Sequence, residues 1–396
     1  MIAKTINKFK KLNFNIYIIA VTLFVNCIMY FSWYPILPIY LRDLGASDLI
    51  IGYIYGVLTF GFTLFQFLGG IFADRFDLKK ILVVTTFLSA PAFVLVGLSP
   101  NWLLLVVFML IIEVLTAVQW PAFMLFISEC SDEKELGFAY SVFEFSILAS
   151  FTVGPAVGSI VLSRFSVPLL MLMSGIVCLI TAVIRQIYLK TPERKVHGSY
   201  DFKILKQFIN RRYALILILF VLLGLIGTIT IYGPFIAMYS KDIFKFSESK
   251  IQLLIFLGNL FASMFSFIAG YLVDKYGTKI MFGLGLFLQG VFFLFWIKAT
   301  GYGGVFFYFF AAMMFLQGAA VAKNKLIMES APEKYRGLFV GLIYTLSGIF
   351  ASTGPVIASY ARNLYGNRAP FYLNFLLGCI IVIFVIVYSM QKDKSK

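Results

Sequence analysis

The chain has 396 residues, of which 61% are hydrophobic and 13% are charged, and its formal net charge is +15. Soluble domains are closer to half apolar and a quarter charged, so the composition excludes an ordinary water-soluble globular fold. The apolar residues fall in solid blocks long enough to cross a bilayer as helices, whereas a barrel would show alternation. We therefore expect an all-α membrane protein.

The apolar blocks predict twelve transmembrane helices. In chain order they cover residues 15–39, 48–72, 79–98, 102–127, 137–162, 167–189, 214–238, 251–273, 279–298, 304–327, 337–360 and 370–390. The first block follows Lys4, Lys8, Lys10 and Lys11 and is too long for the apolar part of a signal peptide. We expect it to be retained as the first helix. An even number of spans puts both termini on the same side.

Basic residues are unevenly divided between the two sets of predicted loops. The set that includes both termini holds 22 of the 33 Lys and Arg residues, and the opposite set, which includes Arg362, holds 8. The remaining three, Arg185, Lys323 and Lys325, lie near the ends of predicted helices. Short cytoplasmic loops carry an excess of Lys and Arg, so we expect both termini in the cytoplasm and the protein in the cell membrane. Because the charges sit in short loops, no nucleic-acid partner is expected.

The two halves of the chain repeat with an offset of 200 residues. The matched pairs are Gly70 and Gly270, Asp74 and Asp274, Lys79 and Lys279, Glu129 and Glu329, and Gly154-Pro155 and Gly354-Pro355. The longest polar break predicts a cytoplasmic linker at 191–213 between six-helix bundles at 1–190 and 214–396. Parallel repeats of this kind occur in secondary transporters, where the substrate site lies between the halves near the midplane.

Polar and aromatic side chains inside the spans predict a water-accessible substrate cavity. Tyr55, Thr59, Thr63 and Gln66 share one helix face, and Asn259 and Ser263 follow at the repeat-related positions of the eighth span. Hydrogen bonding between helices is the alternative interpretation. The full set of cavity candidates is Asn26, Tyr30, Trp33, Tyr55, Thr59, Thr63, Gln66, Trp120, Thr230, Asn259, Ser263, Gln317, Lys323 and Tyr344.

Two acidic residues lie inside predicted spans. A charged side chain at the centre of a membrane helix costs about 2.5–3.5 kcal/mol, so such residues are functional candidates by default. Glu113 lies near the middle of the fourth span and Glu144 lies inside the fifth. Both are candidates for proton coupling, and a hydrogen-bonded structural glutamate is the alternative for each. For Lys323, extension of the side chain to the interface is the alternative to substrate contact.

Two loops resemble the hallmark loop of the major facilitator superfamily. They read Gly70-Ile-Phe-Ala-Asp74-Arg75 and Gly270-Tyr-Leu-Val-Asp274-Lys275. The resemblance implies two pseudo-symmetric six-helix bundles and gating loops in which the aspartate faces a helix N-terminus and the basic residues pair with acids. The first loop departs from the pattern, with Asp77 where glycine is usual. The gating candidates are Gly70, Asp74, Arg75, Lys79, Gly270, Asp274, Lys275, Lys279 and Arg336.

The fifth span contains Gly154-Pro155-Ala-Val-Gly158, which resembles the antiporter signature of drug-exporting members of that family. The match is partial, because Phe145 stands where an upstream glycine is expected and Ser159 replaces a terminal glycine. Proline removes a backbone donor, and glycine permits close packing, so a generic helix kink is the alternative. The helix-bend candidates are Gly154, Pro155, Gly158, Gly354 and Pro355.

These observations together favour the twelve-helix drug/proton antiporter branch. We expect alternating access and proton-coupled efflux of small hydrophobic or cationic compounds, by a monomer in the lipid bilayer. The alternative is a proton symporter for a sugar, an organic acid or another nutrient. No enzyme constellation, nucleotide-binding loop or metal-ligand spacing is found, so we expect no enzyme activity, no metal and no cofactor beyond the coupling proton.

Overall fold

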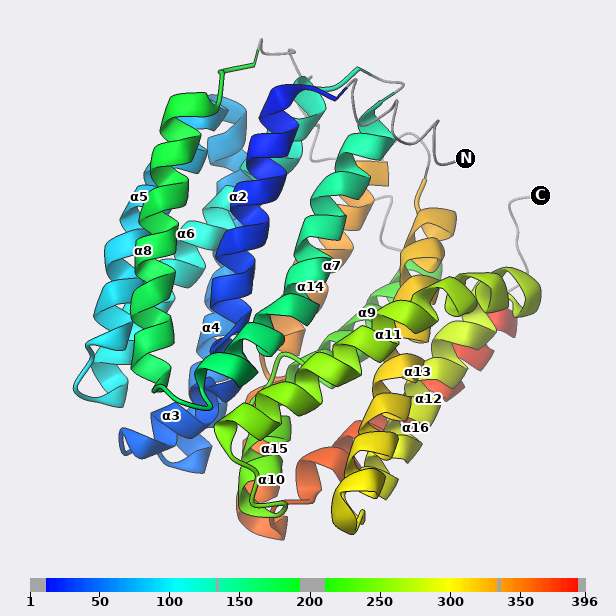
Figure 1. Cartoon of the computed structure of the whole chain (residues 1–396). Helices are drawn as coiled ribbons and strands as arrows, with labels where there is room; N and C mark the ends of the chain where they lie inside the picture. Colours follow the sequence, from blue (N-terminus) through cyan, green and yellow to red (C-terminus); the bar gives the residue numbers. More distant parts are fainter. Residues whose placement is uncertain (1–11, 133–134, 193–210, 333–335, 391–396) are drawn as a thin grey trace. The chain divides into compact units, whose positions relative to one another are not determined.

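The computed structural model describes residues 12–132, 135–192, 211–332 and 336–390, and all regular elements in these ranges are helices (Figure 1). They are α2 (Phe14–Phe31), the 3-10 helix η1 (Tyr34–Ile36), α3 (Leu37–Asp43), α4 (Asp48–Arg75), α5 (Leu78–Gly97), α6 (Trp102–Glu129), α7 (Leu136–Val161), α8 (Val167–Tyr188), α9 (Arg211–Ile229), α10 (Phe235–Asp242), α11 (Glu248–Tyr276), α12 (Thr278–Trp296), α13 (Gly301–Ser330), α14 (Arg336–Ala351), α15 (Gly354–Tyr365) and α16 (Ala369–Met390).

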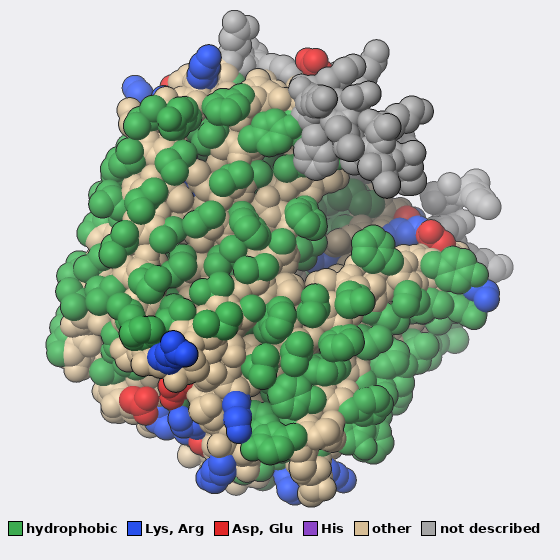
Figure 2. Space-filling model, viewed as in Figure 1, with side chains coloured by type: hydrophobic (Ala, Val, Ile, Leu, Met, Phe, Trp, Pro, Cys, Tyr) green, Lys and Arg blue, Asp and Glu red, His purple; other side chains and the backbone are tan. Residues whose placement is uncertain are grey.

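In the described residues, twelve helical stretches are long and apolar enough to cross a membrane, which confirms the predicted number of spans. Their exteriors are apolar as well, and hydrophobic side chains cover most of the visible surface in Figure 2. An apolar exterior suits hydrocarbon, because lipid tails offer apolar contact and no hydrogen-bond partner. The predicted linker largely coincides with residues 193–210, which lie outside the described residues, as do the basic termini 1–11 and 391–396.

Three of the expected spans are interrupted near a proline. The first breaks after α2 and resumes through η1, which has Pro35 in its first turn, and α3. The expected continuous helix at 214–238 instead ends at Ile229, and α10 begins after Pro234. The eleventh divides into α14 and α15 immediately before Gly354-Pro355. Proline lacks the backbone N–H that a continuing helix needs, which accounts for a break at each position.

The residue contacts divide the chain into two compact units. Unit 1 comprises Met1–Ala46, Gly61–Ser199 and Ser247–Leu253, and unit 2 comprises Ser47–Phe60, Tyr200–Phe246 and Leu254–Lys396. Two helices therefore pass from one unit to the other, α4 after Phe60 and α11 after Leu253. The bundle boundaries expected from the sequence, at 190 and 214, stay a prediction.

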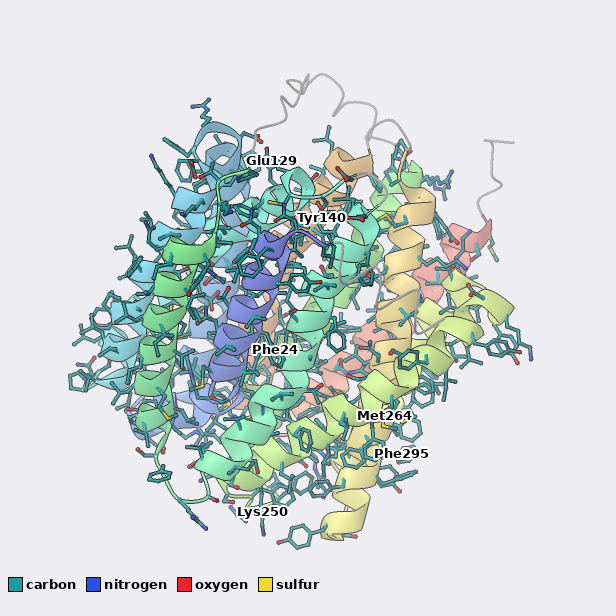
Figure 3. The ribbon with its side chains drawn as sticks, turned by 45° about the horizontal axis from the view of Figure 1, so that its top comes forward. Phe24, Glu129, Tyr140, Lys250, Met264 and Phe295 are labelled. Atoms are coloured by element: carbon teal, nitrogen blue, oxygen red, sulfur yellow. The ribbon has the colours of Figure 1, made fainter. Side chains whose placement is uncertain are left out.

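α7 packs closely on α2 within unit 1. A Cβ atom at Gly154 would lie 2.6 Å from Phe31 Cβ, and one at Gly158 would overlap the Ser32 carbonyl oxygen. One turn earlier, Ser150 Oγ donates to the carbonyl oxygen of Phe24 on α2 at 3.0 Å, and Phe24 is labelled in Figure 3. The glycines of the signature-like segment thus let two helix backbones touch, as small residues do in membrane bundles.

The matching Gly-Pro segment of unit 2 also packs closely on another helix, but its own helix is interrupted there. A Cβ atom at Gly354 would overlap Thr228 Oγ1 on α9, and Thr228 Oγ1 donates to the carbonyl oxygen of Ala351 at 2.9 Å. Each Gly-Pro pair therefore packs on the first helix of its own sequence half. Pro155, however, lies inside the continuous helix α7, whereas Pro355 stands in the first turn of α15. Only the second pair coincides with a helix break.

We predict that Gly158→Ala destabilises the protein while Gly137→Ala does not. The first substitution forces a methyl group into the Ser32 carbonyl, and overpacking of this kind costs about 1–3 kcal/mol. Gly137 is in the same helix with nothing within 4 Å of its Cβ position, so alanine there gains up to about 1 kcal/mol of helix propensity. Thermal unfolding of the two purified variants in detergent checks this, and equal midpoints would contradict the close contact.

Candidate functional site

Glu113 is hydrogen-bonded to an aromatic cluster in unit 1. Tyr30, in the last turn of α2, donates its hydroxyl to Glu113 Oε1 in α6 at 2.8 Å. The Tyr30 ring stacks on Tyr34 at a centroid distance of 4.8 Å and meets Trp33 edge-on at 5.2 Å. Phe93 of α5 adds a further edge contact to Tyr30 at 6.4 Å. A carboxyl group and several ring faces are thus gathered where three helices meet.

The break after α2 positions this cluster. α2 ends at Phe31, and the fully buried Trp33 then donates its Nε1 to Ser174 Oγ of α8 at 2.9 Å. One turn before Tyr30, Asn26 Nδ2 donates to Thr181 Oγ1, also in α8, at 2.8 Å. The side chains of Asn26 and Trp33, both cavity candidates, therefore form hydrogen bonds with α8 and hold α2 in place. Tyr30 is left to reach Glu113.

The other acidic candidate lies in different surroundings. Glu144 is exposed on α7. Near it, Tyr140 donates its hydroxyl to the carbonyl oxygen of Met124 in α6 at 3.0 Å, and Trp120 meets Phe143 edge-on at 5.9 Å. Figure 3 shows Tyr140 near the same end of unit 1 as Glu129, the last residue of α6. A proton-coupling role for Glu144 stays a prediction.

In unit 2 the structure brings together Lys323 and Tyr344. Lys323 Nζ of α13 lies over the Tyr344 ring of α14, 5.6 Å from its centroid, and Phe220 of α9 meets the same ring edge-on at 5.9 Å. Such cation–π contacts contribute about 0.5–1 kcal/mol at exposed sites. Tyr344 is 41% exposed within the protein, so its ring can still meet a ligand or lipid.

The remaining cavity candidates differ in burial and in the unit to which they belong. The hydroxyls of Thr59 and Thr230 return to their own helices, at Tyr55 and Ile226. The α4 stripe is shared between units, since Tyr55 and Thr59 belong to unit 2, and Thr63 and Gln66 to unit 1. The structure places Tyr55, Thr63 and Thr230 as buried, Gln66, Asn259 and Gln317 as half-buried, and Ser263 as exposed. A cavity role for this set stays a prediction.

The two hallmark loops end α4 and α11 and differ at the position after each. Gly277 adopts φ +90°, which glycine readily adopts, before α12 begins. Asp77, its repeat partner, has φ −62° and caps α5 instead, accepting a hydrogen bond from the Lys80 backbone at 2.9 Å. A side-chain cap replaces the glycine turn, which explains how the first loop departs from the family pattern.

Two lysines of the second loop lie over tyrosine rings. Lys279 Nζ lies 4.4 Å from the Tyr388 ring centroid, and Lys275 Nζ lies 5.1 Å from that of Tyr276. The ion pair in this loop joins Asp274 to Lys325 at 2.6 Å, with both side chains exposed, and exposed pairs contribute at most about 1 kcal/mol. Asp274 thus contacts a lysine side chain of α13. In the first loop, Asp74 and Arg75 are exposed and Lys79 is half-buried, and Arg336 begins α14.

Sequence reasoning missed Arg185, which it assigned to a helix end. The side chain is 1% exposed in unit 1. Its Nε donates to Thr22 Oγ1 at 2.9 Å, its Nη1 donates to Thr86 Oγ1 at 2.7 Å, and its guanidinium lies 5.0 Å from the Phe123 ring centroid. The signal that could have found it is its position inside the apolar run of α8, where a charge is costly without partners.

A bundle of twelve apolar spans with a few polar clusters inside each unit is the architecture of a multi-pass membrane transporter. The comparisons agree. A sequence model of the Major Facilitator Superfamily matches residues 19–238 and 218–396. The chain belongs to the Major Facilitator Superfamily, whose members are transporters and not enzymes.

Relatives and solved structures of this family match along nearly the whole chain. An uncharacterized MFS-type transporter of Methanocaldococcus jannaschii is 24% identical over 397 residues, covering 94% of each chain. The quinolone resistance protein NorA of Staphylococcus aureus is 22% identical over 378 residues, covering 91% of this chain and 93% of NorA.

Two solved transporters share the fold. A bacterial homolog of the human lysosomal transporter Spinster has a TM-score of 0.79 at 13% identity, covering 94% of this chain and 96% of that one. The nucleoside transporter NupG has a TM-score of 0.76 at 14% identity, covering 95% and 98%. At these identities the likeness shows the fold alone.

We predict that Arg185→Met is tolerated by the fold and Arg185→Glu is not. Thr22 and Thr86 already donate to carbonyls of their own helix at 2.6 Å, so methionine leaves no hydroxyl proton unpaired. A glutamate at this position would face the Thr22 and Thr86 hydroxyls, whose protons are already donated to backbone carbonyls. Its carboxylate would then be a buried charge without a partner, which costs about 3–5 kcal/mol. Unfolding midpoints of both variants in detergent measure this difference, and a stable Arg185→Glu protein would contradict the arrangement.

Proposed function

We propose that this transporter works by alternating access and exports small hydrophobic or cationic compounds in exchange for protons. The observation that carries the proposal is the hydrogen bond from Tyr30 to Glu113 inside the aromatic cluster. Glu113 is the proposed proton-coupling residue, and the rings of Tyr30, Trp33 and Tyr34 are the proposed contacts for the transported compound.

The chemistry of this cluster suits exchange of a proton for a cation. A carboxylate and aromatic ring faces both attract a lipophilic cation, the first by charge and the second by cation–π contact and apolar burial. A protonated carboxyl group loses the charge attraction and gains an O–H hydrogen-bond donor. Binding of a cation and binding of a proton at Glu113 would therefore oppose each other, as antiport requires.

The relatives give the proposal limited support. NorA is named for quinolone resistance, which is consistent with export of drug-like compounds. The solved structures of similar fold include a nucleoside transporter and a POT family transporter in complex with a conjugated peptide, so the fold alone does not favour export. The contact between Lys323 and Tyr344 favours the alternative, proton-coupled uptake of an organic acid or another nutrient, because a lysine can bind a carboxylate.

The charge distribution supports a cell-membrane location with both termini in the cytoplasm. Within unit 1, Lys250 lies at the end opposite Glu129 in Figure 3, as expected for loops on opposite sides. We also propose that the protein acts as a monomer, with the proton as its coupling ion and no other cofactor.

We predict that Glu113→Gln keeps substrate binding and folding but abolishes coupling to the pH gradient. Glutamine preserves the size of the side chain and the acceptor for Tyr30, and it cannot take up or release a proton. The measurement is dissipation of a pH gradient in proteoliposomes loaded with a pH dye, on addition of lipophilic cations, sugars and organic acids in turn. Glu135→Gln, outside the spans, is the matched control.

The outcomes separate the two functions. Dissipation by a lipophilic cation in the parent and the control, with loss in Glu113→Gln, supports the exporter. Dissipation by a sugar or an acid together with its uptake supports the symporter. An unchanged proton response in Glu113→Gln would remove Glu113 from the coupling mechanism, and attention would move to Glu144.

A further inference from the structure

Among the described residues, two charged side chains are buried, Arg185 in unit 1 and Arg362 in unit 2. They differ in how their charge is balanced. Arg362 lies beside two carboxylates, with Asp242 Oδ2 at 2.5 Å from Nη2 and Asp48 Oδ2 at 3.1 Å from Nε. Arg185 forms no ion pair with any described residue. The positive charge of Arg185 is therefore not balanced by a carboxylate in the described part of the chain.

The Arg185 side chain extends away from the nearer end of its helix. The residue lies in the last turn of α8, and the Lys190 backbone just beyond exchanges hydrogen bonds with Asn15 at the start of α2. The guanidinium instead reaches Thr22 and Thr86, each eight residues, or about 12 Å, from the start of its own helix. Arginines near helix ends usually extend to the interface, where water hydrates the charge. An inward side chain needs another source of stabilisation.

The contacts around the guanidinium leave three of its N–H groups without a partner among the described residues. An arginine carries five such donors. Nε gives one to Thr22 and Nη1 gives one to Thr86. Thr86 Oγ1 also accepts from Gln119 Nε2 at 2.9 Å, so both of its lone pairs are used. The Phe123 ring, with its centroid 5.0 Å from Cζ, attracts the charge but does not balance it. Nη2 and one proton of Nη1 therefore remain available.

We propose that unit 1 binds one small monovalent inorganic anion of the size of chloride against the available N–H groups of Arg185. Such an anion accepts these donors and also balances the buried charge, which a water molecule does not do. The side chain is 1% exposed and turned away from the helix end, so a lipid headgroup or a large organic anion does not reach it. The inference is independent of the proposed function, because the anion belongs to the folded unit and is not the transported compound.

The site would connect four helices of unit 1. Arg185 of α8 contacts Thr22 of α2, Thr86 of α5 and Phe123 of α6. An anion that binds only the folded protein stabilises it in proportion to its occupancy. The same reasoning agrees with the tolerance expected for Arg185→Met, because methionine removes the charge together with the need for an anion.

The first experiment measures anion binding directly. Purified protein in detergent is incubated with radioactive chloride at constant ionic strength, with gluconate as the replacing anion, and bound chloride is counted by scintillation proximity. We expect one saturable site per chain in the parent and none in Arg185→Met. Arg164→Met, which removes an exposed arginine of the same unit, is the matched control and keeps the site. Bromide and nitrate compete with chloride, whereas gluconate is too large to do so.

A lysine variant tests the site without removing the charge. Arg185→Lys carries one nitrogen in place of the three of the guanidinium, so it cannot contact both threonines and the anion in the same way. Loss of one charge-assisted hydrogen bond predicts a chloride affinity about tenfold lower than in the parent. This variant also decides the question if Arg185→Met does not fold.

The second experiment measures the effect of the anion on stability. Replacing gluconate by chloride at ten times the dissociation constant is expected to raise the unfolding midpoint of the parent by about 3 °C. The midpoint of Arg185→Met should not respond, and this variant also reports any general effect of the salt. Arg185→Lys should respond less than the parent at the same chloride concentration.

The outcomes decide whether the site exists. No chloride binding in the parent would overturn it and would mean that the hydroxyls and the ring suffice for the buried charge. Binding retained in Arg185→Met would overturn it as well, because the anion would then lie elsewhere, and so would parental affinity in Arg185→Lys. Loss of binding and of the chloride-dependent midpoint in Arg185→Met, with both retained in Arg164→Met, supports the site.

Discussion

The rest of this structure depends on the absence of hydrogen-bond partners in hydrocarbon. Every backbone N–H and C=O in a span must be satisfied inside the protein, so the described spans are helices. The same constraint governs side chains. Hydroxyls of several threonines and serines donate to carbonyls three or four residues earlier in their own helix, and those of Thr22, Thr85, Thr86, Ser150 and Thr228 are among them. Only groups that a helix cannot satisfy alone, such as Glu113, Arg185 and Arg362, require a partner on another helix.

The groups that need a partner on another helix mark where polar interactions occur inside the protein. Glu113 receives the Tyr30 hydroxyl, Arg185 uses two threonine hydroxyls, and Arg362 takes two carboxylates. Each arrangement needs helices close enough for short side chains to meet. Glycine supplies that proximity, at Gly154 and Gly158 where α7 touches α2, and at Gly52 and Gly56 where α4 touches α15. Packing and polar chemistry are thus coupled, because the same contacts that bring backbones together decide which polar groups can pair.

The internal repeat shows how far equivalent residues diverge in their surroundings. Gly154-Pro155 and Gly354-Pro355 both pack on the first helix of their own half, yet only the second coincides with a helix break. Asp77 caps a helix with its side chain where Gly277 uses a positive φ. The repeat therefore preserves the order of the spans and the helix on which each Gly-Pro pair packs, while the helix limits differ between the halves. Individual contacts vary, because each depends on neighbouring side chains, which differ between the halves.

The sequence by itself determined the number of spans, their approximate limits, the repeat and the family, because hydropathy and loop motifs are local properties of the chain. It also singled out Tyr30 and Glu113, though in separate sets, since nothing along the chain says that residues 83 apart form a hydrogen bond. Arg185 was read as a helix end and Arg362 as a loop residue, because their burial depends on distant helices. Tertiary structure alone decided which polar groups are partners, because pairing depends on the distance between helices, and sequence spacing does not contain that distance.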